Sequence, residues 1–383
     1  MRDLEQCRND IDNIDRQLVR LFEKRMALSR EIALIKEKAG LSIYDHERED
    51  ILIKNRLDLL REKNLATKLK LFFHTLMDLS KEEQAAYLTP NLPTEEKSIT
   101  PITAINKEQA IAYQGVPGAY SHQALYNYFG PQATSISCTD FAQVLSEVLK
   151  QDAAYGILPA ENSTTGSINR VYDMLVNYPV SIVGEIILPI YHCILGLPQA
   201  QLADIKEIYS HEQGFEQCRP FLEKYPQWEK RPYHNTALSA KYIKERADIH
   251  KAAIASAHAA HTYGLKILAE NIQAQQENST RFFIITNQSE QMKEGSKLTF
   301  TFTLAHQSGS LYHVLQILAQ KDWNLTHIES RPIPGKNFEY RFFADIVGKF
   351  SFHEALLMLK QLEPYVRSCR LLGLYQKAGK AHG

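Results

Sequence analysis

The stretch LEQCRNDIDNIDRQLVRLFEKRMALSREIALIKEK, residues 4–38, decides the organisation of this chain because it is typical of one uninterrupted amphipathic helix. Its apolar residues recur at alternating steps of three and four, as they do along the seam of a coiled coil. The seam positions are Leu4, Cys7, Ile11, Ile14, Leu18, Leu21, Arg25, Leu28, Ile32 and Ile35. A helix of this length without Gly or Pro needs an equally long partner, which favours a dimer.

Arg25 stands at a seam position where its neighbours are apolar. An unpaired charge there would be costly, so we expect something to match it. Arg25 and Lys36 share a face and are about 16 Å apart, whereas Arg8 is about 25 Å from Arg25. One helix cannot bring all three cations to one small molecule, but a second, antiparallel copy can supply Arg8. An ordinary coiled coil, in which a polar residue fixes the register, fits the same pattern.

Two more helices are predicted to follow. Asp45 stands where a cap is expected before a helix over 46–64, with Arg48 and Glu49 in its first turn. A helix over about 66–88 places Ser80 and Gln84 on one face.

With these positions in view, residues 1–88 resemble the all-helical, intertwined chorismate mutases. The matching residues are Arg8, Arg25, Lys36, Asp45, Arg48, Glu49, Ser80 and Gln84. The resemblance implies that Lys36 and Gln84 donate to the breaking ether oxygen and that Glu49 accepts a substrate hydroxyl. Arg8 of the partner chain and Arg25 would clamp carboxylates, since arginine forks bond them bidentately. Chorismate is a dianion that rearranges without proton transfer, so a catalyst can only hold the reactive conformer and stabilise charge.

The composition limits the remaining possibilities. The 383 residues suggest two or three domains. Lys plus Arg equals Asp plus Glu at 44 each, which gives no argument for nucleic acid or a membrane surface as a partner. The charged N-terminus is unlike a signal peptide, and the apolar stretch 186–197 is too short to span a bilayer. Five scattered cysteines favour reduced thiols in a cytoplasm. No metal site is expected.

The region 107–287 is predicted to be α/β. A proline-bearing stretch over 90–106 reads as a linker before it. Short apolar runs then alternate with amphipathic stretches of helical pattern. The expected strands cover 111–113, 134–138, 154–158, 181–187, 205–209, 252–255 and 282–286, and the expected helices include 141–150, 168–176 and 237–245. The region is long enough for two lobes, with a crossing near 189–198, and a cleft between lobes is the default site.

Polar clusters follow several of these strands. Residues 115–121 (GVPGAYS) end the first strand and open a helix, a geometry that offers free backbone N–H groups to an anion. Further clusters lie at 161–166 (ENSTTG), 210–213 (SHEQ) and 280–282 (TRF). Each alone is typical of a cap or a turn, but their common position at strand ends indicates a site. There is no GxGxxG fingerprint, which argues against a Rossmann dehydrogenase.

Together these motifs resemble the prephenate dehydratases, whose fold is two α/β lobes like those of periplasmic binding proteins. The resemblance implies loss of water and CO2 from prephenate to give phenylpyruvate, with no redox cofactor or metal. It makes Thr280 the essential residue, as proton donor or its positioner, with His211 and Glu161 as candidate proton sources on chemistry alone. Arg281 is a candidate carboxylate clamp. The remaining candidate substrate ligands are Ser121, Asn162, Thr164, Ser210 and Gln213.

The segment 296–376 is predicted to be βαββαβ, a ferredoxin-like arrangement. Two of its turns, 309–311 (GSL) and 329–332 (ESRP), resemble the ACT regulatory domains of phenylalanine-sensitive dehydratases. The resemblance implies feedback by L-phenylalanine through Gly309, Ser310, Leu311, Glu329, Ser330, Arg331 and Pro332. The family usually has Pro-Gly-Ala-Leu where this chain has Ser-Gly-Ser-Leu from Ser308, which puts the strength of inhibition in question.

The expected domains are therefore a mutase over 1–89, a linker over 90–106, a dehydratase over 107–287 and an ACT domain over 296–376. The expected function is a bifunctional enzyme of L-phenylalanine biosynthesis that acts as a homodimer or higher homo-oligomer. The alternatives are a non-enzymatic amino-acid sensor, or a chain in which only one activity is live.

Overall fold

The computed structural model describes residues 3–41, 46–88, 100–304, 309–321 and 323–379. The chain divides into two compact units, Met1–Lys97 and Ser98–Gly383. Asp45 and Ser308, which the sequence analysis singled out, lie outside the described residues. Among the described residues, no helix has the length and hydropathy needed to cross a membrane.

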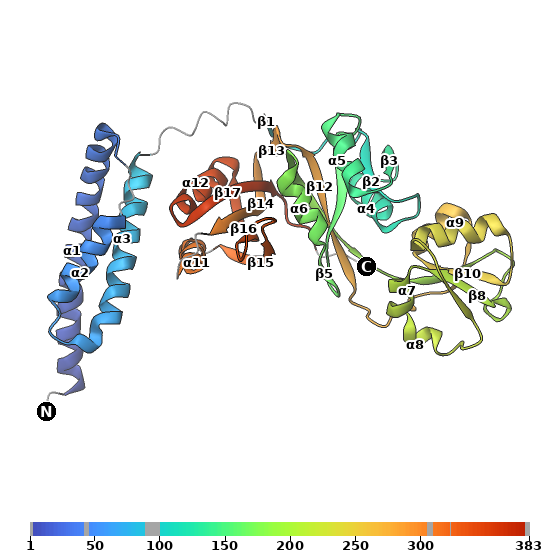
Figure 1. The fold of residues 1–383 in the computed structure, drawn as a ribbon, viewed down its shortest axis with the longest axis horizontal. Coiled ribbons are helices and arrows are strands. Elements are labelled where there is room, and N and C mark those ends of the chain that lie inside the picture. Colours follow the sequence, from blue (N-terminus) through green and yellow to red (C-terminus); the bar gives the residue numbers. More distant parts are fainter. Residues whose placement is uncertain (1–2, 42–45, 89–99, 305–308, 322, 380–383) are drawn as a thin grey trace. The chain divides into compact units, whose positions relative to one another are not determined.

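The first unit is helical (Figure 1). Helix α1 spans Leu4–Ala39, with an Asp3 capping box at its start and Gly40 in the left-handed conformation at its end. Helix α2 spans His46–Asp58, a short 3-10 turn follows at Lys63–Leu65, and α3 spans Ala66–Leu88. The first and third helices match the prediction. The second helix ends at Asp58, earlier than predicted. No Gly or Pro directly follows Asp58, so the sequence contains no signal for this end.

Helix α1 does not bury its predicted seam within this unit. The residues it buries are Met26, Ser29 and Ala33, which lie on a neighbouring stripe. The Leu and Ile residues of the seam stay open to solvent, with exposed fractions between 43% at Ile32 and 68% at Leu4. Helix α3 therefore covers one stripe of α1 and leaves the heptad stripe uncovered.

The second unit contains a ten-stranded sheet in the order β15-β16-β14-β17-β6-β12-β4-β2-β3, with β5 paired to β4. The strands at its β3 end are β2 (Ile111–Gln114), β3 (Ser135–Cys138), β4 (Tyr155–Asn162), β6 (Val180–Pro189) and β12 (Ser279–Asn287). Helices α4 (Tyr120–Phe129), α5 (Phe141–Leu149) and α6 (Asn169–Asn177) pack on it. These are the predicted strands and helices, with small differences at their ends.

A separate five-stranded sheet has the order β11-β7-β10-β8-β9. Its strands are β7 (Cys193–Gly196), β8 (Glu207–Ser210), β9 (Glu229–Pro232), β10 (Lys251–Ala255) and β11 (Lys266–Ala269), and its helices include α7 (Glu212–Gln217), α8 (Arg219–Leu222), α9 (Thr236–Arg246) and α10 (Ala257–Tyr263). The chain passes from one sheet to the other between Pro189 and Cys193, within the predicted crossing, and returns between Ala269 and Ser279. Strands β7, β9 and β11 were not predicted. Strand β9 is exposed and charged, so it carries no apolar alternation to reveal it.

The last segment follows the predicted βαββαβ order. Its elements are β14 (Glu294–Leu304), α11 (Ser310–Gln320), β15 (Asn324–Pro332), β16 (Tyr340–Ser351), α12 (Phe352–Leu362) and β17 (Val366–Tyr375). Its strand β17 joins β6 through one parallel pair, Gly373 with Ile182. A Cβ on Gly373 would overlap the Ile182 carbonyl oxygen, so only glycine permits this approach. Within the expected linker, Thr100–Ile102 forms β1 and pairs with β13 (Glu290–Met292).

Candidate active sites

In the helical unit, Arg25 lies where α1 meets α3. Its Nη1 donates to the Leu76 carbonyl oxygen at 2.7 Å and to the Ser80 hydroxyl. Partial burial lowers the pKa of Arg25 from its ordinary value, but a guanidinium stays charged. Gln84 follows one turn after Ser80 and is buried, and its Nε2 donates to the Ser80 carbonyl oxygen at 3.2 Å. The structure therefore brings Arg25, Ser80 and Gln84 together.

Glu49 is held by Lys81, a residue that the sequence pattern did not predict to be part of the site. Lys81 is 7% exposed, lies 3.2 Å from Glu49 and also pairs with Asp78 at 2.8 Å. The ion pair with Lys81 keeps the Glu49 carboxylate in place beside the α3 face that carries Ser80 and Gln84. The only sequence feature that pointed to Lys81 is that it directly follows Ser80, a predicted site residue.

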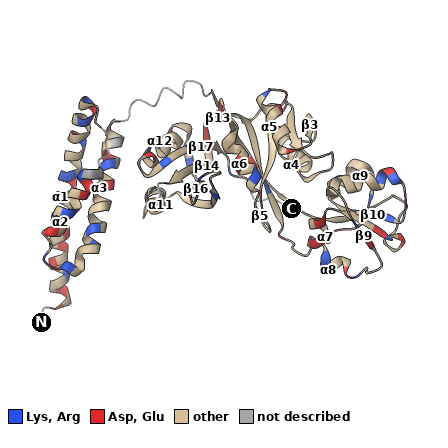
Figure 2. Cartoon of the chain, viewed as in Figure 1, with Lys and Arg blue, Asp and Glu red and all other residues tan. Residues whose placement is uncertain are grey.

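The other predicted mutase residues lie along α1 and α2. Arg8 is exposed near the start of α1, and Lys36 is half-buried in its last turn. Arg48 is exposed on α2. Positive and negative side chains are both distributed along this unit (Figure 2). Within one copy, Arg8 and Lys36 are at opposite ends of a helix of 36 residues, so they do not meet.

A second candidate site is a cavity of about 450 Å³ in the α/β unit. It is lined by residues that lie within strands of the large sheet or in the turns and helices next to strands of both sheets. These are Gln114, Gly115, Ala119, Tyr120, Ser121, Pro159, Asn162, Thr165, Ile168, Ile190, His192, His211, Gln213, Gly214, Gln217, His234, Asn235, Thr236, Thr280 and Phe282. None of these described lining residues is a Lys, Arg, Asp or Glu. We call this cavity the cleft.

Thr280 is oriented in the cleft by Asn162 on the neighbouring strand. Asn162 Oδ1 accepts from the backbone N–H groups of Thr164 and Thr165 at 3.1 and 3.2 Å, which fixes the orientation of the amide. Its Nδ2 then donates to Thr280 Oγ1 at 3.0 Å and to Asn278 Oδ1 at 2.8 Å. Because Thr280 Oγ1 accepts this bond, its own hydroxyl hydrogen is left to donate into the cleft.

Helix starts supply further neutral donors to the cleft. His211 caps α7, since its Nδ1 accepts from Gln213 N–H at 3.2 Å. The ring therefore carries its proton on Nε2 when neutral. Asn235 caps α9 through a bond from Leu238 N–H at 2.7 Å. Ser121 lies in the first turn of α4, where its hydroxyl donates to the Gln114 carbonyl oxygen.

Several predicted ligands are not in the cleft. Ser210 is fully buried and its hydroxyl donates to the Ile254 carbonyl oxygen at 3.3 Å. Thr164 bonds to Asn162, and its neighbour Thr165 lines the cleft instead. Glu161 lies 3.8 Å from Arg281 and does not line the cleft, so its placement does not support a role as proton source.

Arg281 faces away from the cleft, which corrects the expectation that it clamps substrate. Successive side chains of a strand point to opposite faces, and Thr280 takes the cleft face. Arg281 is 8% exposed, and its Nε donates to Glu185 at 2.7 Å while Nη2 donates to the Tyr375 hydroxyl at 2.9 Å. Asp345 lies 2.6 Å from its Nη1. Burial opposes the charge on Arg281, yet its pKa is raised because Tyr375, Asp345 and Glu185 surround it.

A cleft-lining chain of hydrogen bonds was missed. The Tyr120 hydroxyl lies 2.8 Å from His192 Nδ1, and His192 Nε2 lies 2.7 Å from Gln217 Oε1. Burial lowers the pKa of His192 and raises that of Tyr120, so both are neutral. His192 lies where the chain crosses between sheets, and its sequence context is an apolar run that gave no sign of a site.

The predicted regulatory residues occupy two places in the last segment. Gly309, with a φ of 86°, precedes Ser310 and Leu311 at the start of α11. Glu329 accepts from Ser167, and Arg331 pairs with Asp173 of α6 at 2.7 Å, so these two side chains contact the neighbouring α/β region. The alternate residues Ser330 and Pro332 are exposed on β15, the outermost strand.

Comparisons with known proteins identify each unit. The family model for chorismate mutase type II matches residues 7–85, and that for prephenate dehydratase matches residues 111–290. A bifunctional chorismate mutase/prephenate dehydratase of Enterobacter agglomerans is 32% identical over 96% of this chain and 94% of its own length.

Two solved structures are similar over part of the chain. The prephenate dehydratase of Arthrobacter aurescens, solved in complex with L-Phe, is 28% identical with a TM-score of 0.62, covering 70% of this chain and 90% of that one. GqqA, described as a novel type of quorum quenching acylase, is 30% identical with a TM-score of 0.63, covering 71% of this chain and 98% of that one.

The two models together define a fusion of a mutase with a dehydratase. The chain belongs to the family of bifunctional chorismate mutase/prephenate dehydratases, which confirms both resemblances that the sequence indicated.

Proposed function

We propose that this chain converts chorismate to prephenate in its helical unit and prephenate to phenylpyruvate in the cleft, for phenylalanine biosynthesis in the cytoplasm. The match of a separate family model to each unit carries this proposal. Five free cysteines support a reducing compartment. The proposed domains are 1–89, 107–287 and 296–376, and the division of the chain at Lys97 supports a linker between the first two.

In the mutase site, Arg8, Arg25 and Arg48 hold the two carboxylates of chorismate, with Asp45 and Ser80 beside them. Lys36 and Gln84 donate to the ether oxygen as its bond breaks, and Glu49 accepts the ring hydroxyl. The placement of Arg25, Ser80 and Gln84 on adjoining helices supports these roles. The ion pair of Lys81 with Glu49 adds a group that fixes this acceptor.

We infer that a second copy of the chain completes this site. The heptad stripe of α1 is exposed, and an apolar groove of about 460 Å³ lies beside Arg25, lined by residues such as Leu18, Phe22 and Phe72. An uncovered stripe of this length on a soluble helix requires a partner. An antiparallel copy covers it and brings its own Arg8 towards Arg25 and Lys36.

Mixing two inactive variants tests the shared site. Arg8→Ala and Lys36→Ala chains each lack one residue of every mutase site in their own homodimers. A hybrid dimer has one intact site, so an equal mixture should recover about a quarter of the wild-type mutase rate. Complete absence of recovery, with subunit exchange confirmed by mass spectrometry, would argue against sharing across chains.

In the cleft, Thr280 passes a proton to the departing ring hydroxyl and takes one up from solvent water, so that it ends the step as a hydroxyl, while the ring carboxylate leaves as CO2. The ring hydroxyl takes up the proton from Thr280 and leaves as water. The C–C bond between the ring and the carboxylate breaks, and its electron pair enters the ring. Gln213, His211 and the backbone N–H groups around Ser121 hold the remaining oxygens of prephenate, and Asn162 acts through Thr280. The bond from Asn162 to Thr280 is the observation that supports this assignment.

We further propose that residues 296–376 form an ACT domain that binds L-phenylalanine and inhibits the dehydratase. The strand order β17-β14-β16-β15 supports the ferredoxin-like arrangement, and a relative of known structure was solved with L-Phe. Gly309, Ser310, Leu311 and Glu329 to Pro332 are the proposed ligand-binding positions.

A coupled assay tests both the activities and the regulation. Purified chain should consume chorismate and accumulate phenylpyruvate, and millimolar L-phenylalanine should slow only the second step. Prephenate that accumulates without phenylpyruvate would contradict the dehydratase assignment. Equal rates with and without L-phenylalanine, together with no binding by calorimetry, would contradict the regulatory one.

A further inference from the structure

Helix α10 of the five-stranded-sheet region packs against the turn 115–119, which precedes α4 in the ten-stranded-sheet region. The Tyr263 hydroxyl donates to the Pro117 carbonyl oxygen at 2.6 Å, and the Ser256 hydroxyl donates to the Gly118 carbonyl oxygen at 3.3 Å. A Cβ on Gly118 would lie 3.1 Å from Ala259 Cα, so the two backbones are in close contact. Residues 115 and 119 at the two ends of this turn line the cleft.

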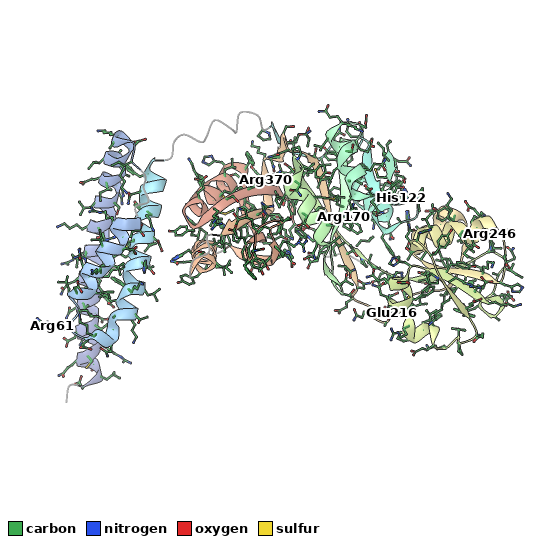
Figure 3. All side chains as sticks on the ribbon, viewed as in Figure 1. Arg61, His122, Arg170, Glu216, Arg246 and Arg370 are labelled. Atoms are coloured by element: carbon green, nitrogen blue, oxygen red, sulfur yellow. The ribbon has the colours of Figure 1, made fainter. Side chains whose placement is uncertain are left out.

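A pair of histidines adds a directed bond to this contact. His122 Nδ1 accepts from the Gly118 N–H at 3.2 Å and lies 2.9 Å from His258 Nε2. Because the backbone N–H must donate, Nδ1 is the acceptor nitrogen of His122, and the proton between the two rings belongs to His258 Nε2. His122 Nδ1 on α4 therefore accepts two hydrogen bonds, one from His258 of α10 and one from Gly118 of the turn. Figure 3 labels His122 on α4.

The surroundings keep this pair neutral. His122 is 6% exposed, with its ring between Tyr113 of β2 and Tyr126 of α4, at centroid distances of 4.8 and 4.6 Å. Burial lowers the pKa of His122 to about 4, with a smaller contribution from His258. Burial also lowers the pKa of His258, next to the exposed His261 on the same helix. A proton on His122 Nδ1 would face two donors, so the arrangement holds only while the ring is neutral.

We propose that His258 is a positioning residue of the dehydratase cleft, which acts through His122 to hold the 115–119 turn against the substrate. This proposal rests on the proposed function of the cleft. Neither histidine lines the cleft itself, so neither contacts the substrate. Apolar side chains of the same shape would fill this space at least as well. What the imidazole pair adds is direction, because it fixes the position of Gly118 and with it Gly115 and Ala119, which line the cleft at the two ends of the turn.

Three variants of α10 separate positioning from simple packing. His258→Leu keeps the volume and removes the donor, so we expect the KM for prephenate to rise about tenfold with kcat reduced less than threefold. His258→Gln restores an N–H donor near the position of Nε2 and should return KM to within about threefold of wild type. His261→Leu is the matched control, since His261 is exposed on the same helix and its variant should have wild-type KM.

Each variant is measured with two internal references, the mutase rate of the same chain and the thermal unfolding of the α/β unit. A wild-type KM for His258→Leu, or equal losses in the Leu and Gln variants with unchanged unfolding, would overturn the proposal. If the Leu variant fails to fold, the Gln variant decides the case. A Gly118 amide that is as protected from exchange as in wild type, together with a raised KM, overturns the proposal. Thr280→Ala run in parallel shows separately whether the cleft is the dehydratase site.

Discussion

The helical unit and the α/β unit hold related anionic substrates with opposite kinds of surface. The proposed mutase site has arginine and lysine side chains on or beside an apolar helix stripe that is uncovered in one copy. The cleft is enclosed by two regions of a single chain, and none of its described lining residues is a Lys, Arg, Asp or Glu. A small dianion can thus be held by charged forks at an interface, or by backbone and amide N–H donors at helix starts. In the proposed function, the first arrangement is completed by a partner chain, whereas the second depends on local rigidity.

The largest expected effect comes from removing a cation of the mutase site. Lys36→Ala should lower mutase kcat by about 10² to 10³, because one preorganised donor to the ether oxygen is lost. Dehydratase turnover should be unchanged. Lys38→Ala, two residues later and exposed, is the control. Equal loss of both activities in continuous assays would argue against separate sites.

Removing the hydroxyl of Thr280 should produce the converse result. We expect Thr280→Ala to lower dehydratase kcat by about 10² and to leave the mutase rate unchanged, whereas Thr280→Ser should retain activity. Thr286→Val is the matched control, since Thr286 is buried on the same strand and donates to Ala154 away from the cleft. Retained dehydration in the alanine variant would remove Thr280 from its role.

Acid should destabilise the α/β unit through His122. Its pKa is about 4 in the folded chain, against about 6.5 when unfolded, so the unfolded state binds more protons between these values. The stabilisation is complete above pH 6.5 and is lost as the pH falls to 4, by roughly 1 to 3 kcal/mol. Calorimetry of wild type and His122→Phe from pH 7 to 4 checks this. Parallel pH curves for the two proteins would contradict it.

Salt should raise the KM of the mutase site more than the KM of the dehydratase cleft, although this is the smallest of the expected effects. Raising NaCl from about 0.05 to 0.5 M shortens the screening length, so the KM for chorismate should rise about threefold. The KM for prephenate should change by less than about 1.5-fold, since its ligands are neutral donors. Steady-state kinetics at constant pH measure both, and an equal rise would mean that cations outside the cleft lining attract prephenate.

The sequence predicted the elements with local patterns and missed the features that depend on tertiary contacts. The helices at 4–39 and 66–88 and the βαββαβ segment follow from periodicity alone. Thr280 and Asn162 were predicted to belong to one site because each lies in a polar cluster at the end of a predicted strand. In the structure the two side chains are hydrogen-bonded.

The misplaced residues show what a pattern cannot supply. Alternation along β12 already implied that Arg281 and Thr280 point to opposite faces, but not which face carries the cleft. Ser210 is the last residue of β8 and its side chain is buried. A motif at a strand end does not show which of its residues point into the cleft. His192 and Lys81 act through partners distant in sequence, so only the folded chain reveals them.

The junction between β6 and β17 has a mechanical consequence. One backbone pair joins the two parts of the large sheet there, and the side chains of Arg281, Glu185, Asp345 and Lys297 connect them behind it. Buried ion pairs add little net stability, because desolvating the charges offsets their attraction. We therefore expect the β6–β17 junction to separate first when the sheet is pulled. A pulling experiment on the α/β unit would therefore show the C-terminal segment detaching whole, before any internal ladder is broken.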